Sequence, residues 1–158
     1  MKYRILSNDE LKHFEDELIA FLVVNGIDGS TWENMNKHDP VKAVGLVEIF
    51  SDHVLEKVYS KIEYIEHRMK NSCLVFHFGE QEQALIAIQS NNDSQIDLST
   101  TDGIHKALSE QLYQLSLFTS KRKYSTERNM EIHELLEHGA IISSKEFWNA
   151  LLALTNPQ

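Results

Sequence analysis

A change of hydrophobic period near residue 70 constrains the fold of this chain more than any other feature of its sequence. Before that point, apolar residues recur every three or four positions, which is the period of an amphipathic helix. Two short runs rich in β-branched and aromatic residues follow, 72–79 and 84–89, separated by a polar loop. These runs predict an antiparallel hairpin, and the helical period returns after it.

Capping signals mark where the first helix begins and ends. Ser7 followed by Glu10 forms a capping box, and the apolar pattern after it predicts one helix over about residues 8–25. The Asn-Gly pair at 25–26 stops that pattern, because glycine readily takes the left-handed conformation that closes a helix.

The longest predicted helix comes next. Ser30 with Glu33 repeats the capping signature before a short segment, and Pro40 occupies the first position of the following helix. The apolar stripe of that helix runs over residues 41–69, so we expect it to carry the core.

The rest of the chain predicts further strands and helices. They are a turn at 90–94, a strand at 95–98, a helix that begins at 99–102 and ends near 113, a strand at 115–119, a helix capped by Ser125 and ended by Gly139, and a helix with a capping box of Ser143 and Glu146. Together the elements predict an α+β fold, with four to six helices packed around a small antiparallel sheet of two to four strands.

Length and composition predict a single globular domain over residues 1–158, since 42% of the residues are hydrophobic and 25% are charged. A chain of this length buries roughly 68–70% of the surface that its unfolded form exposes, so it needs no disulfide or metal to fold. Cys73 is the one cysteine, and no apolar run approaches the roughly 20 residues of a transmembrane helix. We therefore expect a cytoplasmic protein with no membrane partner.

The formal net charge of -9 makes nucleic acid an unlikely partner, because an acidic protein repels phosphate backbones. One basic cluster departs from this balance and leads into a predicted helix N-terminus, where free N–H groups favour anions. The candidate anion-binding residues are Lys121, Arg122, Lys123, Ser125 and Arg128. The favoured interpretation is a polar connection that offsets an acidic surface.

The stretch 133–138, His-Glu-Leu-Leu-Glu-His, is the most suggestive of metal chemistry. It matches neither H-E-x-x-H nor H-x-x-E-H, because Glu137 stands where the former needs its second histidine and Glu134 stands where the latter needs its first. We favour a solvated helix face. The alternative is a metal site formed across a helix interface, for which the candidate ligands are His133, Glu134, Glu137, His138, Glu63 and His67.

Two other groups of residues receive a structural interpretation. Cys73 and His77 share a strand face but stand about 13 Å apart along it, so a packed thiol is favoured over a nucleophile and its base. Carboxylates line the long helix opposite its apolar stripe and are interpreted as a solubilising face. These carboxylates are Glu48, Asp52, Glu56, Glu63 and Glu66.

Several stretches together resemble an uncharacterised bacterial family of about the same length, known only as a domain of unknown function. The stretches are residues 1–4, 50–52, 63–67, 76–80, 97–100, 124–125, 128–129 and 137–140, or MKYR, FSD, EYIEH, FHFGE, DLST, YS, RN and EHGA. The resemblance covers almost the whole chain and implies a cytoplasmic bacterial protein without assigned activity. It carries over no catalytic residue, although His67, His77 and Arg128 fall inside the matching stretches.

The function we expect first is a non-enzymatic interaction or regulatory module, because the fold is well patterned and no catalytic set is assembled. Its partner is another protein or a second copy, bound through the long helix in a homodimer. No cofactor is predicted. The alternative is a metal-dependent or phosphate-handling enzyme that uses the His and Glu pairs or the basic cluster, and nucleic-acid binding ranks third.

Overall fold

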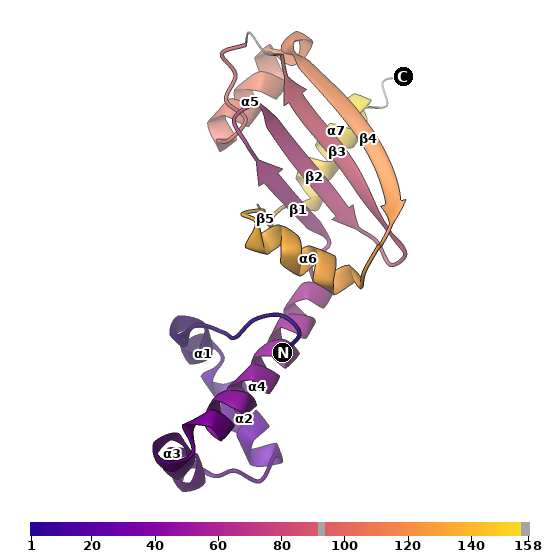
Figure 1. The fold of residues 1–158 in the computed structure, drawn as a ribbon. Helices are drawn as coiled ribbons and strands as arrows, with labels where there is room; N and C mark the ends of the chain where they lie inside the picture. The colour runs from indigo at the N-terminus through magenta and orange to yellow at the C-terminus, as the bar shows by residue number, and fades with distance from the viewer. Residues whose placement is uncertain (92–93, 156–158) are drawn as a thin grey trace. The chain divides into compact units, whose positions relative to one another are not determined.

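The computed structural model describes residues 1–91 and 94–155, so the turn predicted at 90–94 lies partly outside the described residues. The chain divides into two compact units, residues 1–60 and the chain from residue 61 onward (Figure 1). Within the described ranges there are seven α-helices and five strands, which confirms the α+β class. The predicted numbers, four to six helices and two to four strands, are too low.

The first unit is helical, and its first predicted helix is in fact two. Its helices are α1 (Asn8–His13), α2 (Glu15–Val24), α3 (Gly29–His38) and α4 (Pro40–Ser60). The capping box of Ser7 and Glu10 is confirmed, but the helix breaks at Phe14, where φ is -101° and ψ is 26°. Gly26 adopts a φ of 76°, so the predicted end of the pattern is confirmed.

Local capping also places α3 and the start of α4. The Asp28 side chain caps α3 by accepting a hydrogen bond from the Thr31 amide at 2.7 Å, so the predicted cap at Ser30 is wrong. Pro40 is the first residue of α4, as predicted. The helix ends at Ser60, however, and not near residue 69. The predicted end is wrong because residues 64–68 pair as a strand of the sheet.

The N-terminal segment lies along α4. The main-chain amides of Lys2 and Tyr3 both donate to the Asp52 carboxylate, and the Tyr3 hydroxyl donates to Glu56. These two carboxylates belong to the group interpreted as a solubilising face. They therefore also fasten the start of the chain to α4.

Glu10 gives this unit a testable dependence on pH. Its carboxylate accepts two hydrogen bonds of 2.8 Å from Arg4 and one from the Ser7 amide, which lower the pKa of Glu10 from 4.5 to about 2. A lowered folded pKa means that these contacts stabilise the unit fully above pH 4.5 and are lost as the pH falls toward 2. We expect an NMR titration of the Glu10 carboxyl to have its midpoint near pH 2.

Replacement of Arg4, which removes the positive charge beside Glu10, is the control for that titration. In Arg4→Gln the largest cause of the shift is absent, so the midpoint of Glu10 moves up toward 4.5. A midpoint that stays near 4.5 in the unsubstituted protein would contradict the assignment.

The second unit is built on an antiparallel sheet of order β4-β3-β2-β1-β5. The strands are β1 (Tyr64–Arg68), β2 (Ser72–Phe78), β3 (Glu82–Ser90), β4 (Leu115–Lys123) and β5 (Ile141–Ile142). The predicted hairpin is confirmed as β2 and β3, and the predicted strand at 115–119 is confirmed as the first part of β4. The predicted strand at 95–98 is wrong. Ile96 and Leu98 are nevertheless buried, because this segment packs under the sheet as irregular chain.

Helices α5 (Thr101–Glu110) and α7 (Lys145–Thr155) cover one face of the sheet (Figure 1). Their buried side chains meet inward-facing residues of β2 and β3 and form the core of the unit. The largest contributors are Val75, Ile86, Ile88, Leu98, Ile104, Trp148 and Leu151. Each fully buried aliphatic or aromatic side chain contributes about 1.5–3 kcal/mol, so this face holds the unit together.

The N-caps of the last two helices lie one or two residues beyond the predicted caps. Helix α6 (Arg128–Glu137) follows the N-cap residue Glu127, and Ser125 hydrogen-bonds elsewhere, so the predicted cap at Ser125 is wrong. The hydroxyl of Ser144 accepts from the Phe147 amide at 3.1 Å, so α7 is not capped by Ser143.

Candidate functional site

Strand register places the side chains of three strands in rows on the face of the sheet opposite the core. Because side chains alternate between the two faces of a strand, every second residue of β2, β3 and β4 belongs to this face. The three rows are Phe78, Gln83 and Arg122; Phe76, Leu85 and Ser120; and Leu74, Ala87 and Phe118. We call these nine residues the pocket face.

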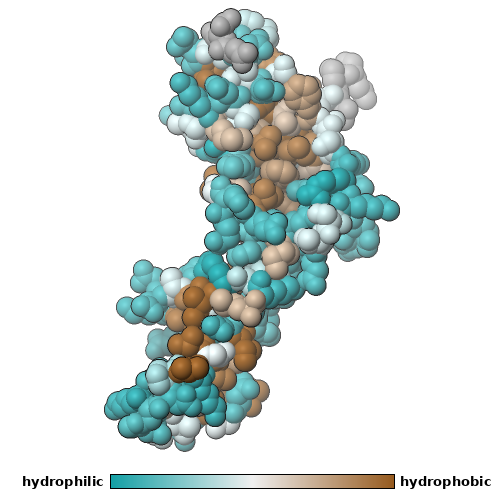
Figure 2. All heavy atoms as spheres, in the orientation of Figure 1, coloured by the Kyte–Doolittle hydropathy of each residue, from teal (hydrophilic) through white to brown (hydrophobic). Residues whose placement is uncertain are grey.

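The pocket face is covered at one end only. Helix α6 lies over the first two rows, where Phe78 is buried, whereas in the third row Phe118 is 55% exposed and Leu74 and Ala87 are half-buried. Figure 2 shows hydrophobic side chains gathered on the surface of this unit, over the sheet. One face of the sheet is thus a closed core, and the other presents apolar surface.

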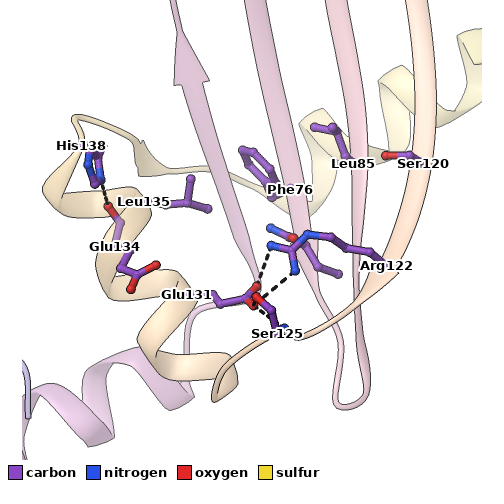
Figure 3. Close-up of a pocket in the computed structure, with 10 residues that line it drawn as sticks. Phe76, Leu85, Ser120, Arg122, Ser125, Glu131, Glu134, Leu135 and His138 are labelled. Carbon is purple, nitrogen blue, oxygen red and sulfur yellow. Dashed lines mark hydrogen bonds and ion pairs between the residues drawn. The ribbon is translucent and has the colours of Figure 1, made fainter.

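A pocket of about 410 Å³ lies between α6 and the first two rows (Figure 3). Its wall is part apolar and part polar. The lining residues are Phe76, Gln83, Leu85, Ser120, Arg122, Ser125, Glu131, Glu134, Leu135 and His138. That volume is within the range of small-molecule sites, about 300–1,000 Å³.

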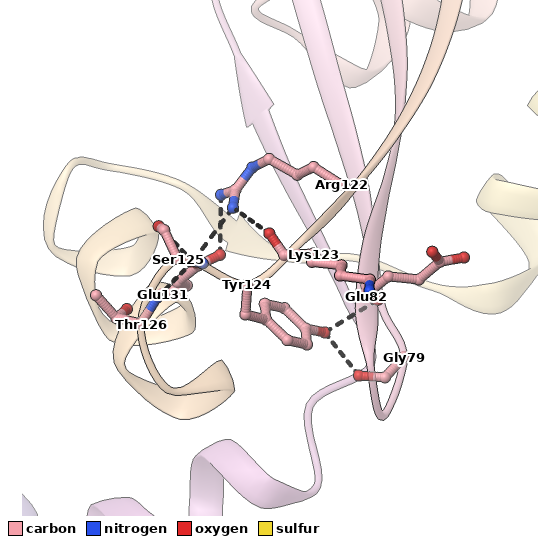
Figure 4. Close-up of polar contacts among 8 residues, drawn as sticks. All are labelled: Gly79, Glu82, Arg122, Lys123, Tyr124, Ser125, Thr126 and Glu131. Carbon is pink, nitrogen blue, oxygen red and sulfur yellow. Dashed lines mark hydrogen bonds and ion pairs between the residues drawn. The ribbon is translucent and has the colours of Figure 1, made fainter.

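Glu131 is the polar centre beside this pocket. It is only 6% exposed, and its carboxylate accepts hydrogen bonds from Arg122 at 2.8 and 3.2 Å and from the amide and hydroxyl of Ser125 at 2.8 and 3.0 Å (Figures 3 and 4). The Thr126 amide adds a longer contact of 3.3 Å. Burial raises the pKa of this carboxyl, but the hydrogen bonds outweigh burial and lower it overall.

The Arg128 guanidinium binds main-chain carbonyl oxygens and does not form part of an exposed anion-binding site. Its guanidinium donates to the carbonyls of Ile62 at 2.5 Å, Phe78 at 3.1 Å and Gly79 at 3.3 Å, and to Asn129 Oδ1 at 3.0 Å. The start of α6 is therefore fastened to the end of β2 and to the chain before β1. This is a structural role for a residue predicted as an anion ligand.

Tyr124 fastens the other side of the same loop. Its hydroxyl donates to the Gly79 carbonyl at 2.6 Å and lies 3.2 Å from the Glu82 carbonyl oxygen (Figure 4). Its ring stacks on that of Phe78. Burial raises the pKa of this phenol. The turn between β2 and β3 is thereby held against the β4–α6 connection.

The five predicted anion-binding residues are thus only partly brought together. Arg122 and Ser125 meet at Glu131, and Arg128 binds carbonyls of the β2 end. Lys121 and Lys123 lie on β4 with their side chains on the opposite face from that of Arg122, and Lys121 Nζ lies 3.9 Å from a carboxylate oxygen of Glu82. A buried carboxylate occupies the centre of the predicted cluster, so its basic side chains do not converge on one open point.

The predicted metal ligands are on separate elements. Glu63 precedes β1, His67 lies on β1 near Gly139, and the other four residues lie on or directly after α6. The His138 ring Nδ1 lies 2.6 Å from the Glu134 carbonyl oxygen. Within residues 1–91 and 94–155, no three His, Cys, Asp or Glu side chains are grouped in a way that could hold a metal ion.

Cys73 is a packed thiol. It is fully buried in the core face of the sheet, and burial raises its pKa to about 12, far from the thiolate that a nucleophile requires. His77 lies on the same strand and stacks on Tyr64, with a distance of 4.8 Å between ring centroids.

Sequence analysis missed three residues of the site: Gln83, Tyr124 and Glu131. Glu131 has no local signature, since its partners come from β4 and from the loop before α6. Gln83 could have been found from the sequence, because it is a polar residue two positions before Leu85 and therefore lies on the same face of the strand as that apolar residue. That signal is weak in a hairpin whose two faces are both largely apolar.

Comparison with known proteins places the chain in one family. The model of a family of unknown function, DUF6495, matches residues 1–156. Neither the curated proteins nor the solved structures include a match to the chain. Among the described helices, none combines the length and apolar composition needed to span a membrane.

Proposed function

Because the chain belongs to DUF6495, a family of unknown function, we propose a role from its own surfaces: a non-enzymatic interaction module whose first partner is a second copy of itself. The contact we propose is the free edge of β4, where two copies pair as antiparallel strands. The observation that carries this proposal is Phe118, a large aromatic side chain 55% exposed on an edge strand of nine residues.

The β4 edge has the properties of a pairing edge. Strand β4 is the first in the sheet order, so among the described residues one side of its main chain has no neighbouring strand. Soluble proteins usually protect such edges with charges, prolines or bulges. The first six residues of β4, 115–120, carry no charge and no proline, and only 121–123 are basic.

Charge also permits a symmetric pair. With the two-fold axis at Phe118, each Lys121 lies opposite Leu115 of the other copy, and the two basic ends point away from each other. Six residues of extended chain separate the two Lys121 positions by about 20 Å. That distance is about twice the Debye length at 0.1 M salt, so repulsion between the ends is weak.

We prefer β4 to the long helix as the contact because α4 ends at Ser60 and, as a helix, offers a partner only its side chains. An edge strand adds main-chain hydrogen bonds to the contact of its side chains. A strand pair through β4 therefore gives the self-association predicted from sequence a more specific surface.

Opposite charges at residue 118 test this contact. We expect Phe118→Glu and Phe118→Lys each to weaken self-association by about 100-fold or more, since both copies lose a phenyl worth about 1.5–3 kcal/mol and gain facing like charges. An equimolar mixture of the two variants should regain a dimer, which native mass spectrometry resolves by mass.

Met69→Glu is the matched control, because it places the same charge at a 40% exposed apolar residue in the turn after β1. It should leave the dimer unchanged. A monomeric unsubstituted protein at 100 times the concentration used for the variants, or a Phe118→Glu protein that stays dimeric, would overturn the proposal.

A further inference from the structure

We propose that the pocket beneath α6 binds a small carboxylate with an apolar body. The proposal does not rest on the β4 dimer, because the pocket uses side chains on one face of the sheet, whereas the dimer uses the main-chain edge of β4 and Phe118. It begins from Gln83, which lines the pocket and is 4% exposed.

Gln83 presents its side-chain amide to the pocket. The residue as a whole is 4% exposed, but its amide is not one of the fully enclosed polar groups of the described chain. The amide forms no hydrogen bond with another described residue, so its donors and its acceptor are available on the pocket side. An amide held in this position can pair with a polar group supplied from outside the chain.

Arg122 provides the second half of the head-group site. One edge of its guanidinium, Nη1 and Nη2, is used by Glu131 and by the Lys123 carbonyl. The other edge, Nε–H with the second N–H of Nη2, has no partner among the described residues. Two parallel N–H groups on one guanidinium edge match the two oxygens of a carboxylate.

Register brings these two groups side by side. Gln83 and Arg122 are cross-strand partners in β3 and β4, and neighbours of this kind have Cβ atoms about 4.5–5.5 Å apart. A carboxylate can thus accept from the free guanidinium edge and from the Gln83 amide together. Ser120, one row further along the face, adds a hydroxyl to the same wall.

The charges around the pocket favour a single negative charge over a double one. Glu131 is ionised and balances Arg122, while Glu134 and His138 of the α6 region also line the pocket. A phosphate dianion would meet both glutamates with only one guanidinium edge to receive it. A carboxylate carries less charge and has the planar shape of that edge.

The rest of the pocket accommodates an apolar body. Phe76, Leu85 and Leu135 line it beside the polar group, and the third row of the pocket face extends the apolar surface toward Phe118. The ligand class is therefore an aryl or alkyl carboxylate, which is either a free acid or the carboxyl-terminal residue of a peptide.

Calorimetric titration of the full chain with three matched probes tests the head group. The probes are 4-phenylbutyrate, its neutral amide and 4-phenylbutylamine. We expect the carboxylate to bind with a Kd of about 0.1–1 mM and at least tenfold more tightly than the other two. Equal binding of the carboxylate and amide, or no carboxylate binding by folded protein at 10 mM, would overturn the proposal.

Variants then locate the site. Gln83→Leu removes the amide, and Arg122→Lys keeps the charge beside Glu131 but loses the planar edge, so each should weaken 4-phenylbutyrate binding by at least tenfold. Lys121→Gln is the matched control, since its side chain is on the opposite face of β4, and it should bind as the unsubstituted protein does. Circular dichroism confirms that each variant is folded, and unchanged binding by both site variants would also overturn the assignment.

A peptide arm separates the two sources of the carboxylate. Acetyl-Leu-Phe with a free carboxyl terminus is compared with its carboxyl-terminal amide and with 4-phenylbutyrate. Binding of the free peptide alone identifies a protein terminus as the ligand, and preference for 4-phenylbutyrate identifies a small acid. Either result supports a carboxylate site, whereas tighter binding of the amidated peptide contradicts it.

Discussion

Replacing Glu131 by alanine is expected to lower the free energy of unfolding of the second unit by about 2–4 kcal/mol. The carboxylate is 6% exposed and accepts hydrogen bonds from Arg122, Ser125 and Thr126. Its removal leaves several donors without a partner and a guanidinium facing a void. Because Arg122 is half exposed, water recovers part of the loss, which keeps the effect below that of a fully buried pair.

Urea denaturation followed by the fluorescence of Trp148 measures this effect. A Trp32→Phe background removes the signal of the first unit, so the transition reports on the second unit alone. Glu134→Ala is the control, because it removes an exposed carboxylate from the same helix and should change stability by less than about 0.5 kcal/mol. Equal effects of the two substitutions would contradict the role of Glu131.

The same carboxylate makes the second unit sensitive to acid. Folding lowers the pKa of Glu131 below its ordinary value of 4.5. The contribution of this carboxylate to the free energy of unfolding is therefore complete above pH 4.5 and is lost as the pH falls through the lower pKa of the folded state. In Glu131→Ala this part of the pH dependence should be absent. A variant that loses stability in acid as steeply as the unsubstituted protein would contradict the assignment.

Arg128→Lys is the second substitution with a large expected effect, about 2–4 kcal/mol, although it conserves the charge. The guanidinium reaches three main-chain carbonyls, those of Ile62, Phe78 and Gly79, in directions that a single ammonium group cannot reproduce. The same tryptophan-monitored denaturation measures the loss.

A matched change of an exposed cation distinguishes this geometry from charge alone. Lys121→Ala removes a side chain that is 72% exposed and only 3.9 Å from one carboxylate, so its effect should lie within about 0.5 kcal/mol. If Arg128→Lys is as mild as Lys121→Ala, the three carbonyl contacts do not stabilise the fold as proposed.

The predictions that succeeded depend on interactions within a few residues. The capping box at Ser7, the stop at Gly26 and the helix start at Pro40 are each decided by neighbours along the chain. The hairpin of β2 and β3 has two runs rich in β-branched and aromatic residues around a short loop, and its pairing is local as well.

The predictions that failed depend on partners far away in sequence. Residues 62–69 place Ile62, Ile65 and Met69 at spacings that suit a helix, yet β1 forms because β2 and β5 both pair with it. Strand β5 has only two residues and no strand signal of its own, and it exists through its contact with β1.

The candidate site follows the same division. The α+β class and the basic cluster can be read from the sequence, because composition and hydrophobic period reflect local preferences. The sequence does not show that Glu131 occupies the centre of that cluster or that Gln83 lies beside the free edge of Arg122. These contacts depend on the register across β3 and β4 and on the packing of α6, which join residues nine to sixty-six positions apart, and local preferences do not specify such pairs.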